Sequence, residues 1–556
     1  MADGPVSIGE GELLVFHRPP RLLCQVMRRS LSLVMSLLLA TAFGCGDDAG
    51  SHDGGADANV TADARDPLNA VRLRQSLAGA MWANPNIYPV VPIQVTVFGT
   101  AVSVTVEVDG VVVEATDPEN DNLWTAPVSI AGLDLGTPYT VTATGTSLYN
   151  NTVKHEATLT LRTGGLQLTD FAQVGAAATP RVHVVNNELW VTWADRRDTE
   201  REVWLTRMDG SGAALPGYEA PVCIVCDADE TLYGRVAAGD ASLGVLYQKS
   251  GGPYINWFKL VDGDGNNITA PIPLDPAGWN GSFGGDVHFD GEHFIVVWRI
   301  NDGAGAGEIR WMRVHGSTGD VTGPIVVAAS GNGSPIGGFA PFTFVKATSI
   351  IDRTYISFLR DRFDSALALD IPRAQLATVD RDGNVLRTDY AEPEDLWSFN
   401  YDSRVHQING GALLMWGAQD LTASDPIPTT FRAARIDAQG GIDPERVNGT
   451  IMVTAPDHRV EPTFVSHNVF LGSLAWLDER SYAGPSGLIE LYTAPVLDDL
   501  TTDTPTVVPH ARFIEGTSQL NGVLAGTNVV LVWLDERNGN GIGDSRPEVR
   551  LETIWY

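Results

Sequence analysis

One pattern recurs seven times along this 556-residue chain: an apolar run ends in an aromatic residue, usually followed by a polar turn. The clearest copies are VTWADRR (Val191–Arg197), LAWLDER (Leu474–Arg480) and LVWLDER (Leu531–Arg537). The seven aromatic anchors are Trp193, Tyr247, Trp298, Phe358, Trp416, Trp476 and Trp533, spaced 51 to 60 residues apart. Four short strands per unit and a period of this length are typical of one propeller blade. The repeats therefore predict an all-β chain with a seven-bladed β-propeller over residues 166–556.

Each unit carries residues that we expect to build the blade. The aromatic anchor should pack between neighbouring blades, where a large ring buries most area. The polar residues after it have two interpretations: they hydrogen-bond the turn and one another, or they bind a ligand in every blade. A motif shared by most blades favours the structural interpretation. These repeat residues are Trp193, Asp195, Arg197, Trp476, Asp478, Arg480, Trp533, Asp535 and Arg537.

The two ends of the repeat region complement one another. The last unit ends at EVRLETIWY (Glu548–Tyr556), which matches the third strand of earlier units and leaves a fourth strand missing. LQLTDFAQV (Leu166–Val174) precedes the first complete unit and offers such a strand. Because an open sheet edge promotes aggregation, we expect these segments to pair and close the ring.

A family resemblance follows from these units. Their form, P-x-V-x…W-x-D-x-R…DG, resembles the propeller repeats of secreted bacterial lipoproteins and, distantly, sialidase-like propellers. The resemblance extends from Leu166 to Tyr556, about 70% of the chain. The sialidase Asp-box, S-x-D-x-G-x-T-W, does not occur in the sequence. Sialidase propellers look six-bladed, whereas this chain has seven units. The resemblance therefore implies a fold and no sialidase activity.

Residues 1–45 are expected to be a targeting segment. Arg28 and Arg29 precede LSLVMSLLLA (Leu31–Ala40), an apolar run too short to span a bilayer stably. AFGC (Ala42–Cys45) resembles a bacterial lipobox, which implies cleavage before Cys45 and lipidation of its thiol. An ordinary cleaved secretion signal is the alternative interpretation.

Two neighbouring residues refine this expectation. Met27 directly precedes the basic pair, and we expect it to be the true start of the chain. Gly46 follows the cysteine, which in lipoproteins of this type suggests sorting to the outer membrane. The predicted location is the outer membrane, reached through the general secretory route and held only by the lipid anchor.

Two further regions separate the signal from the repeats. Residues 46–67 are rich in Gly, Ala and Asp and cannot bury a core, so we expect a flexible tether. Residues 68–164 contain alternating Val- and Thr-rich runs such as SVTVEVDGVVVEA (Ser103–Ala115), typical of a β-sandwich. This segment resembles bacterial Ig-like or fibronectin-III-like modules. It is expected to act as a spacer, or else to bind sugar or protein.

Charge limits the choice of partners. The formal net charge is −31 and the pI is about 4.6, so nucleic acid is disfavoured because phosphate binding needs basic patches. Against this acidic background, basic and imidazole residues recur in the segment that begins each unit, which should lie beside the central channel. We expect them to bind an anion or an acidic sugar through charge-assisted hydrogen bonds, or else to line a wet channel or pair with neighbouring acidic residues. These candidate ligand-binding residues are Arg181, His183, Arg235, Asp286, His288, Lys346, Arg404 and His406.

Cysteines and one acidic loop suggest covalent or metal chemistry. Cys223 and Cys226 form a C-x-x-C pair, and in an exported protein we expect a local disulfide rather than a redox or half-zinc site. Side chains at i and i+3 of an ideal strand face opposite ways, so the bond should require a turn. The Gly-rich loop DERNGNGIGD supplies oxygen donors that suit calcium, although an ordinary connecting loop also explains it. Its donors are Asp535, Asn538, Asn540 and Asp544.

No catalytic signature decides the function. The sequence has no G-x-S-x-G, no G-x-x-x-x-G-K-[ST] and no H-E-x-x-H. We therefore expect a binding or interaction module whose ligand is an acidic glycan or a protein, with no cofactor beyond a calcium ion. A glycan-active hydrolase or lyase that uses the channel mouth is the first alternative. A structural component of a surface assembly is the second.

Overall fold

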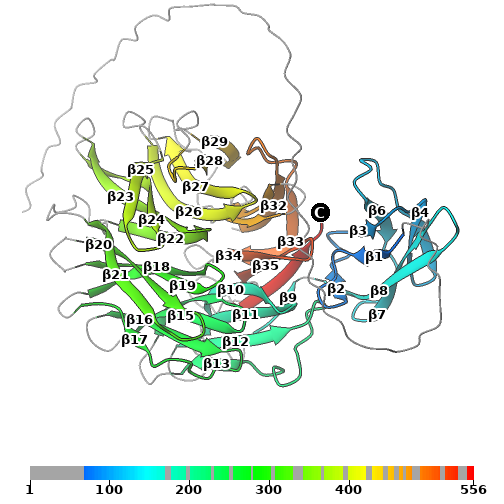
Figure 1. Ribbon diagram of the computed structural model, residues 1–556, viewed down its shortest axis with the longest axis horizontal. Coiled ribbons are helices and arrows are strands. Elements are labelled where there is room, and N and C mark those ends of the chain that lie inside the picture. The colour runs from blue at the N-terminus through cyan, green and yellow to red at the C-terminus, as the bar shows by residue number, and fades with distance from the viewer. Residues whose placement is uncertain are drawn as a thin grey trace, which may run out of the picture. The chain divides into compact units, whose positions relative to one another are not determined.

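A computed structural model shows a chain of β-strands (Figure 1). The chain divides into two compact units, residues 1–61 and 62–556. Among the described residues there is no helix, and hence none long and apolar enough to cross a bilayer. The structure describes residues 68–163, 165–169, 177–195, 201–226, 231–249, 254–276, 280–301, 307–329, 342–364, 369–391, 398–420, 429–442, 449–455, 462–467, 471–478, 489–513, 520–535 and 548–556.

The first part of the described chain forms two sheets. One has the order β1 (Ala70–Leu73), β3 (Val90–Phe98) and β6 (Leu123–Ser129). The other has the order β2 (Ala80–Ala83), β8 (Thr152–Leu161), β7 (Pro138–Thr146), β4 (Ser103–Val108) and β5 (Val111–Glu114). Alternation explains how the two sheets share a core. Val91, Ile93 and Val95 on β3 are fully buried, as are Val106 on β4 and Val141 on β7.

The repeat region forms seven four-stranded antiparallel sheets within the described residues, here numbered 1 to 7. Sheet 1 comprises β10 (Ala178–Val185), β11 (Glu188–Asp195), β12 (Glu202–Met208) and β13 (Val222–Val225), and sheet 2 comprises β14 (Thr231–Ala238), β15 (Ser242–Lys249), β16 (Ile255–Asp262) and β17 (Ile272–Pro273). Sheet 3 comprises β18 (Asn280–Phe289), β19 (His293–Asn301), β20 (Gly307–His315) and β21 (Val321–Ala329), and sheet 4 comprises β22 (Phe342–Ile350), β23 (Arg353–Asp364), β24 (Leu369–Asp380) and β25 (Val385–Tyr390). Sheet 5 comprises β26 (Ser398–Ile408), β27 (Gly411–Asp420), β28 (Thr429–Ile436) and β29 (Thr450–Ala455). Sheet 6 comprises β30 (Thr463–Ser466), β31 (Gly472–Asp478), β32 (Ile489–Val496) and β33 (Thr506–Phe513). Sheet 7 comprises β34 (Leu520–Ala525), β35 (Asn528–Asp535), β36 (Glu548–Ile554) and β9 (Leu166–Gln167).

The aromatic anchors join neighbouring sheets, as the repeat predicted. Each anchor belongs to a hydrophobic cluster that combines its own sheet with the preceding one. Trp476 of sheet 6, for example, shares a cluster with Phe431 of sheet 5. Trp193 of sheet 1 shares one with Val532 of sheet 7, so the first and last sheets also meet. The same arrangement holds for the other five anchors.

The acidic residue two positions after the tryptophan has a local structural role. Trp193 Nε1 donates a hydrogen bond to Asp195 Oδ2 at 2.6 Å, and Trp533 Nε1 donates one to Asp535 Oδ2 at 3.1 Å. Both carboxylates are fully buried. The Trp-x-Asp pattern therefore satisfies an indole N–H inside the sheet, which the sequence interpretation of a turn contact did not include. Arg197, Arg480 and Arg537 lie outside the described residues.

Strand β9 confirms that the two ends of the repeat region pair. Gln167 faces Arg550 and Leu166 faces Leu551 in an antiparallel pair. Beyond the strand, Leu168 N donates to Val549 O at 2.9 Å, and Val549 N donates to Thr169 Oγ1 at 2.9 Å. The described pairing thus covers the beginning of the segment 166–174, and residues 170–176 lie outside the described residues.

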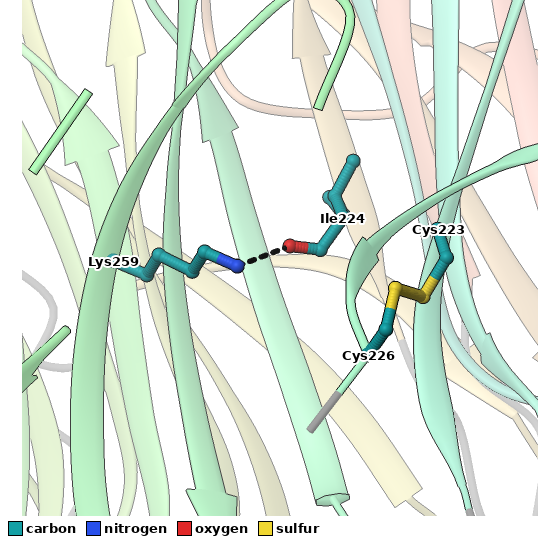
Figure 2. Close-up of a disulfide and its surroundings, with 4 residues drawn as sticks. All are labelled: Cys223, Ile224, Cys226 and Lys259. Atoms are coloured by element: carbon teal, nitrogen blue, oxygen red, sulfur yellow. Dashed lines mark hydrogen bonds between the residues drawn. A yellow bond between two sulfur atoms is a disulfide. The ribbon is translucent and has the colours of Figure 1, made fainter. Parts of the chain in front are cut away.

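Cys223 and Cys226 are joined by a disulfide (Figure 2). The expected turn is replaced by a β-bulge. Along β12, Val203 faces Val225, whereas the next residue, Trp204, faces Cys223. The extra residue is Ile224, and its carbonyl accepts a hydrogen bond from Lys259 Nζ at 2.9 Å (Figure 2). A bulge bends the strand and changes which way side chains face, and so allows the i, i+3 pair to meet.

Candidate functional site

A cavity of about 420 Å³ is lined by residues from the first strand of all seven sheets. Sheet 1 contributes Arg181 and His183, and sheet 5 contributes Arg404 and His406. Sheet 7 contributes residues of β34, including Asn521. Because seven strands from different repeats meet at one cavity, the residues that differ between repeats decide its chemistry. The volume lies within the usual range for small-molecule sites, 300–1,000 Å³.

Strand register sorts these residues into two layers. The charged layer contains the residue that faces the position just before each anchor, and the imidazole layer contains the residue two places later. The charged layer is Arg181, Arg235, Asp286, Lys346, Arg404, Thr463 and Asn521. The imidazole layer is His183, Ala237, His288, Thr348, His406, Val465 and Val523.

Strand alternation explains why these two positions face the cavity. The residue between them points the other way and fills the core between sheets. In sheets 1, 2, 3 and 5 that residue is a valine no more than 6% exposed, as with Val182 and Val405. Arg404 and His406, on either side of Val405, are both partly exposed and line the cavity. In the Arg-Val-His sequence of sheets 1 and 5, the arginine and the histidine therefore face the cavity and the valine faces the core.

The charged layer has one carboxylate among several cations. Lys346 Nζ lies 3.7 Å from Asp286 Oδ1, and Asp286 Oδ2 accepts a hydrogen bond from Ala347 N at 3.3 Å. Burial would raise the pKa of Asp286, but Lys346, Arg181 and Arg235 together lower it below its ordinary value. Asp286 is therefore ionised at neutral pH. Burial lowers the pKa of Lys346 well below its ordinary value, with Asp286 opposing this and the arginines adding to it.

The histidines of the second layer are neutral at physiological pH. Burial and the neighbouring Arg181 guanidinium lower the pKa of His183 to about 4. Burial, Arg404 and Lys346 lower the pKa of His406 to about 3. Burial also lowers the pKa of His288, with Asp286 opposing it. A cationic layer thus lies beside a layer of neutral imidazoles, which hydrogen-bond but add no charge.

Seven of the eight predicted ligand-binding residues line this cavity. Arg235 has the same register but is not among the lining residues, although its charge lowers the pKa of both Asp286 and Lys346. Sequence reasoning missed the contributions of sheets 6 and 7, including Thr463 and Asn521. The interval to the anchor would have found Asn521, which lies twelve residues before Trp533, as Arg181 does before Trp193.

The other predicted sites lie mostly outside the described residues. Cys45, Asn538, Asn540 and Asp544 are all outside them. Asp535 is described, and one of its carboxylate oxygens accepts the Trp533 indole hydrogen bond. In the described part of the chain, the single cluster with metal-ligand spacing is Glu202, Cys223 and Cys226, whose thiols are consumed by the disulfide.

Acid should destabilise the protein through these imidazoles. The pKa of such a histidine is lower in the folded than in the unfolded chain. At high pH it is neutral in both states and does not change the free energy of unfolding. As the pH falls, the unfolded chain is protonated first, which favours unfolding. Between about pH 7.5 and about pH 4.5, His406 should lower the free energy of unfolding by about 2–3 kcal/mol. Urea unfolding at both pH values should therefore show a smaller loss for His406→Gln than for the unsubstituted protein.

The pH dependence of unfolding has to be compared between variants, because other buried groups also contribute to it. Burial raises the pKa of Glu552 to about 7 and of Asp275 to about 6, and such shifts have the opposite sign. Both groups are common to the compared proteins, so the difference isolates His406. His315→Gln, on β20 away from the cavity, is the matched control. An equal acid loss with and without His406 would show that this imidazole is protonated when folded.

Comparison with known proteins assigns no family. No family model matches the sequence, and no curated protein matches it. Among solved structures, the α-L-arabinofuranosidase Arb93A from Fusarium graminearum, complexed with an iminosugar inhibitor, has 11% sequence identity and a TM-score of 0.40. That match covers 58% of this chain and 93% of the other.

Two further structures show comparable likeness. The extracellular domains 1–2 of Drosophila Semaphorin 1a have 7% identity and a TM-score of 0.40, over 70% of this chain and 88% of the other. The polysaccharide lyase Uly1 has 13% identity and a TM-score of 0.37, over 68% of this chain and 90% of the other. These likenesses are distant.

Proposed function

We propose that this protein is a binding module whose cavity takes a ligand with a carboxylate group. The observation that carries the proposal is the meeting of two guanidinium groups, those of Arg181 and Arg404, around one cavity in a chain of net charge −31. Guanidinium groups match planar carboxylates and form charge-assisted hydrogen bonds with them. The acidic exterior would repel an anion, so cations gathered at one place favour a specific site over general attraction.

The seven sheets are the blades of a closed seven-bladed propeller, supported by the anchor clusters and by the pairing of β9 with β36. The two sheets before it form an Ig-like sandwich. The lipobox-like AFGC supports attachment through Cys45 to the outer membrane, where the ligand is either an acidic glycan or a carboxyl group of a protein partner. A structural role in a surface assembly would need no such gathering of charge.

Removing one arginine tests the binding proposal. Arg404→Gln should weaken binding of carboxylates by about 10- to 100-fold, because hydrogen bonds to charged groups contribute about 1.5–3 kcal/mol. Calorimetric titration of the full chain with carboxylates and their uncharged esters measures this. Arg435→Gln, in the same sheet but outside the cavity, is the matched control and should bind normally. Equal affinity for acid and ester in the unsubstituted protein would reject the proposal.

A lyase acting on acidic glycans is a second candidate. The two-carboxylate arrangement of glycoside hydrolases is not favoured, because the described cavity residues include one carboxyl group, Asp286. Elimination requires instead a neutral base beside a cation that holds the substrate carboxylate. His406 is neutral and shares β26 with Arg404, which supports this alternative. Formation of unsaturated sugar ends from polygalacturonate, lost in His406→Gln, would identify it.

A further inference from the structure

The cavity wall changes character at sheets 6 and 7. The charged layer there has Thr463 and Asn521 in place of cations, and the imidazole layer has Val465 and Val523 in place of histidines. We call these four residues the neutral wall. Leu520 and Leu524 of β34 also line the cavity on this side.

The neutral wall is continuous and flanked by guanidinium groups. A Cβ atom on Gly522, between Asn521 and Val523, would lie 2.8 Å from Val465 Cγ2, so β30 and β34 approach closely. Hydrophobic clusters join sheet 5 to sheet 6 and sheet 7 to sheet 1. Arg404 and Arg181 therefore stand at the two borders of the neutral wall. A carboxylate held by them would bring the rest of its molecule against Val523 and Leu524.

The imidazole layer adds a polar requirement. The Nε2 atom of His406 is buried and has no hydrogen-bond partner among the described residues. Buried polar atoms are normally satisfied, so such atoms at a cavity wall indicate a ligand or water partner. His406 follows Arg404 by two residues on an extended strand, which separates the layers by about 6.8 Å. A hydrogen-bonding group on the ligand should lie about that far from its carboxylate.

The cavity is also too large for a simple anion. A water molecule takes up about 30 Å³ in the liquid, so a bare carboxylate would fill only a small part of about 420 Å³. A polyhydroxylated sugar would fill it but would place some of its hydroxyl groups against Val523 and Leu524, which offer no hydrogen-bonding partner. Burying a hydroxyl without a hydrogen bond is unfavourable. An apolar body avoids this cost.

We infer that the ligand is a small amphipathic monocarboxylate. Its carboxylate lies between Arg181 and Arg404, a hydroxyl about 6–7 Å away meets His406, and its apolar face lies on Val523 and Leu524. This inference rests on the proposed function, because it needs the cavity to bind a carboxylate. The proposed function requires only a carboxylate, whereas this inference specifies that amphipathic monocarboxylates bind most tightly. An aromatic hydroxy acid has these three features in one rigid molecule.

A set of four probes tests each feature with the full chain in calorimetric titrations. 4-Hydroxyphenylacetate carries all three. Phenylacetate lacks the hydroxyl and should bind about fivefold more weakly, the effect of one neutral hydrogen bond. 2-(4-Hydroxyphenyl)ethanol lacks the charge and should bind at least tenfold more weakly. Glucuronate keeps the single charge but replaces the apolar body with hydroxyl groups, and should also bind at least tenfold more weakly.

Two variants place the probe in the cavity. His406→Leu should reduce the affinity for 4-hydroxyphenylacetate to that for phenylacetate, while leaving phenylacetate binding unchanged, since the two changes remove the same hydrogen bond. Val523→Thr, which keeps the side-chain volume, should weaken both aromatic acids equally. If His406→Leu does not fold, the comparison of the four probes on the unsubstituted protein still decides the preference.

The outcomes separate this inference from the proposed function. Glucuronate binding as tightly as 4-hydroxyphenylacetate, with both lost in Arg404→Gln, would overturn the inference and leave the anion site standing. Aromatic acids that bind equally to the unsubstituted protein and to both variants occupy another surface, which also overturns it. If no carboxylate of the set binds the unsubstituted protein, the proposed function fails and the inference fails with it.

Discussion

Replacing β9 and the two residues after it with a flexible sequence of the same length is expected to lower the free energy of unfolding by roughly 4–6 kcal/mol. The change is Leu166→Gly, Gln167→Ser, Leu168→Gly and Thr169→Gly. It removes the hydrogen bond from Val549 N to Thr169 Oγ1 and the contacts of two partly buried leucines, and the flexible backbone weakens the bond from Leu168 N to Val549 O. Each hydrogen bond contributes about 1 kcal/mol, and the apolar contacts add a similar amount for each leucine.

Charged groups add to this loss. Gln167 Nε2 donates to Glu548 Oε1 at 3.1 Å, and Gln167 Oε1 accepts from an Arg550 NH2 group at 3.1 Å. Glu548 and Arg550 are 2% and 8% exposed, so removing Gln167 takes hydrogen-bonding partners from buried charges. Chemical denaturation measures the change, because a closed ring should unfold in one transition.

The fourth strand of sheet 4 provides the matched control. Val385→Gly, Leu386→Ser, Arg387→Gly and Thr388→Gly alter the same number of residues on β25, an outer strand exposed over this stretch. That strand joins no chain ends, so its replacement should cost less than half as much. If the two quadruple variants unfold alike, β9 acts as an ordinary outer strand and closure contributes nothing of its own.

The second large effect is expected at a single anchor. Trp476→Ala should lower the free energy of unfolding by about 3–5 kcal/mol, the range for removing a large buried aromatic side chain. Trp476 is fully buried in the cluster between sheets 5 and 6, and its ring stacks on Tyr492 at 5.7 Å between centroids. The cavity left behind cannot close easily, because both sheets are held by their own ladders.

Trp257→Ala gives the comparison for Trp476→Ala. Trp257 lies on β16 and is only partly buried, so the same substitution should cost less. Thermal and urea unfolding of both variants would measure the difference. A loss at position 476 no greater than that at position 257 would show that the anchors are not what holds neighbouring sheets together.

Much of the fold was accessible from the repeat because it depends on local patterns. An apolar strand that ends in a large aromatic residue can bury that ring only against another sheet, and this recurs at every anchor. The turn expected between Cys223 and Cys226 was wrong, since a bulge opposite Val203 and Trp204 brings them together. A bulge depends on how two strands pair, which the order of residues along one strand does not specify.

The candidate site was accessible in part for a similar reason. Arg181, His183, Arg404 and His406 follow the alternation of their own strands, so their common direction could be predicted. The neutral wall could not be recognised in this way. Val465 and Val523 resemble ordinary core residues in the sequence. Val465 is indeed buried between sheets 6 and 7, and only the register of Val523 with the histidines of other sheets assigns it to the cavity.

By itself, the sequence determined the strands, their grouping into sheets and the residues that face inward from the first strands of sheets 1 to 5. These follow from alternation, turn chemistry and a repeated aromatic anchor, all of which act over short stretches of chain. Only the tertiary structure decided which inward residues share a cavity, that Asp286 is paired with Lys346, and that His406 is neutral. Electrostatic interaction and desolvation depend on distances between strands far apart in the chain, and those distances exist only once the sheets have assembled.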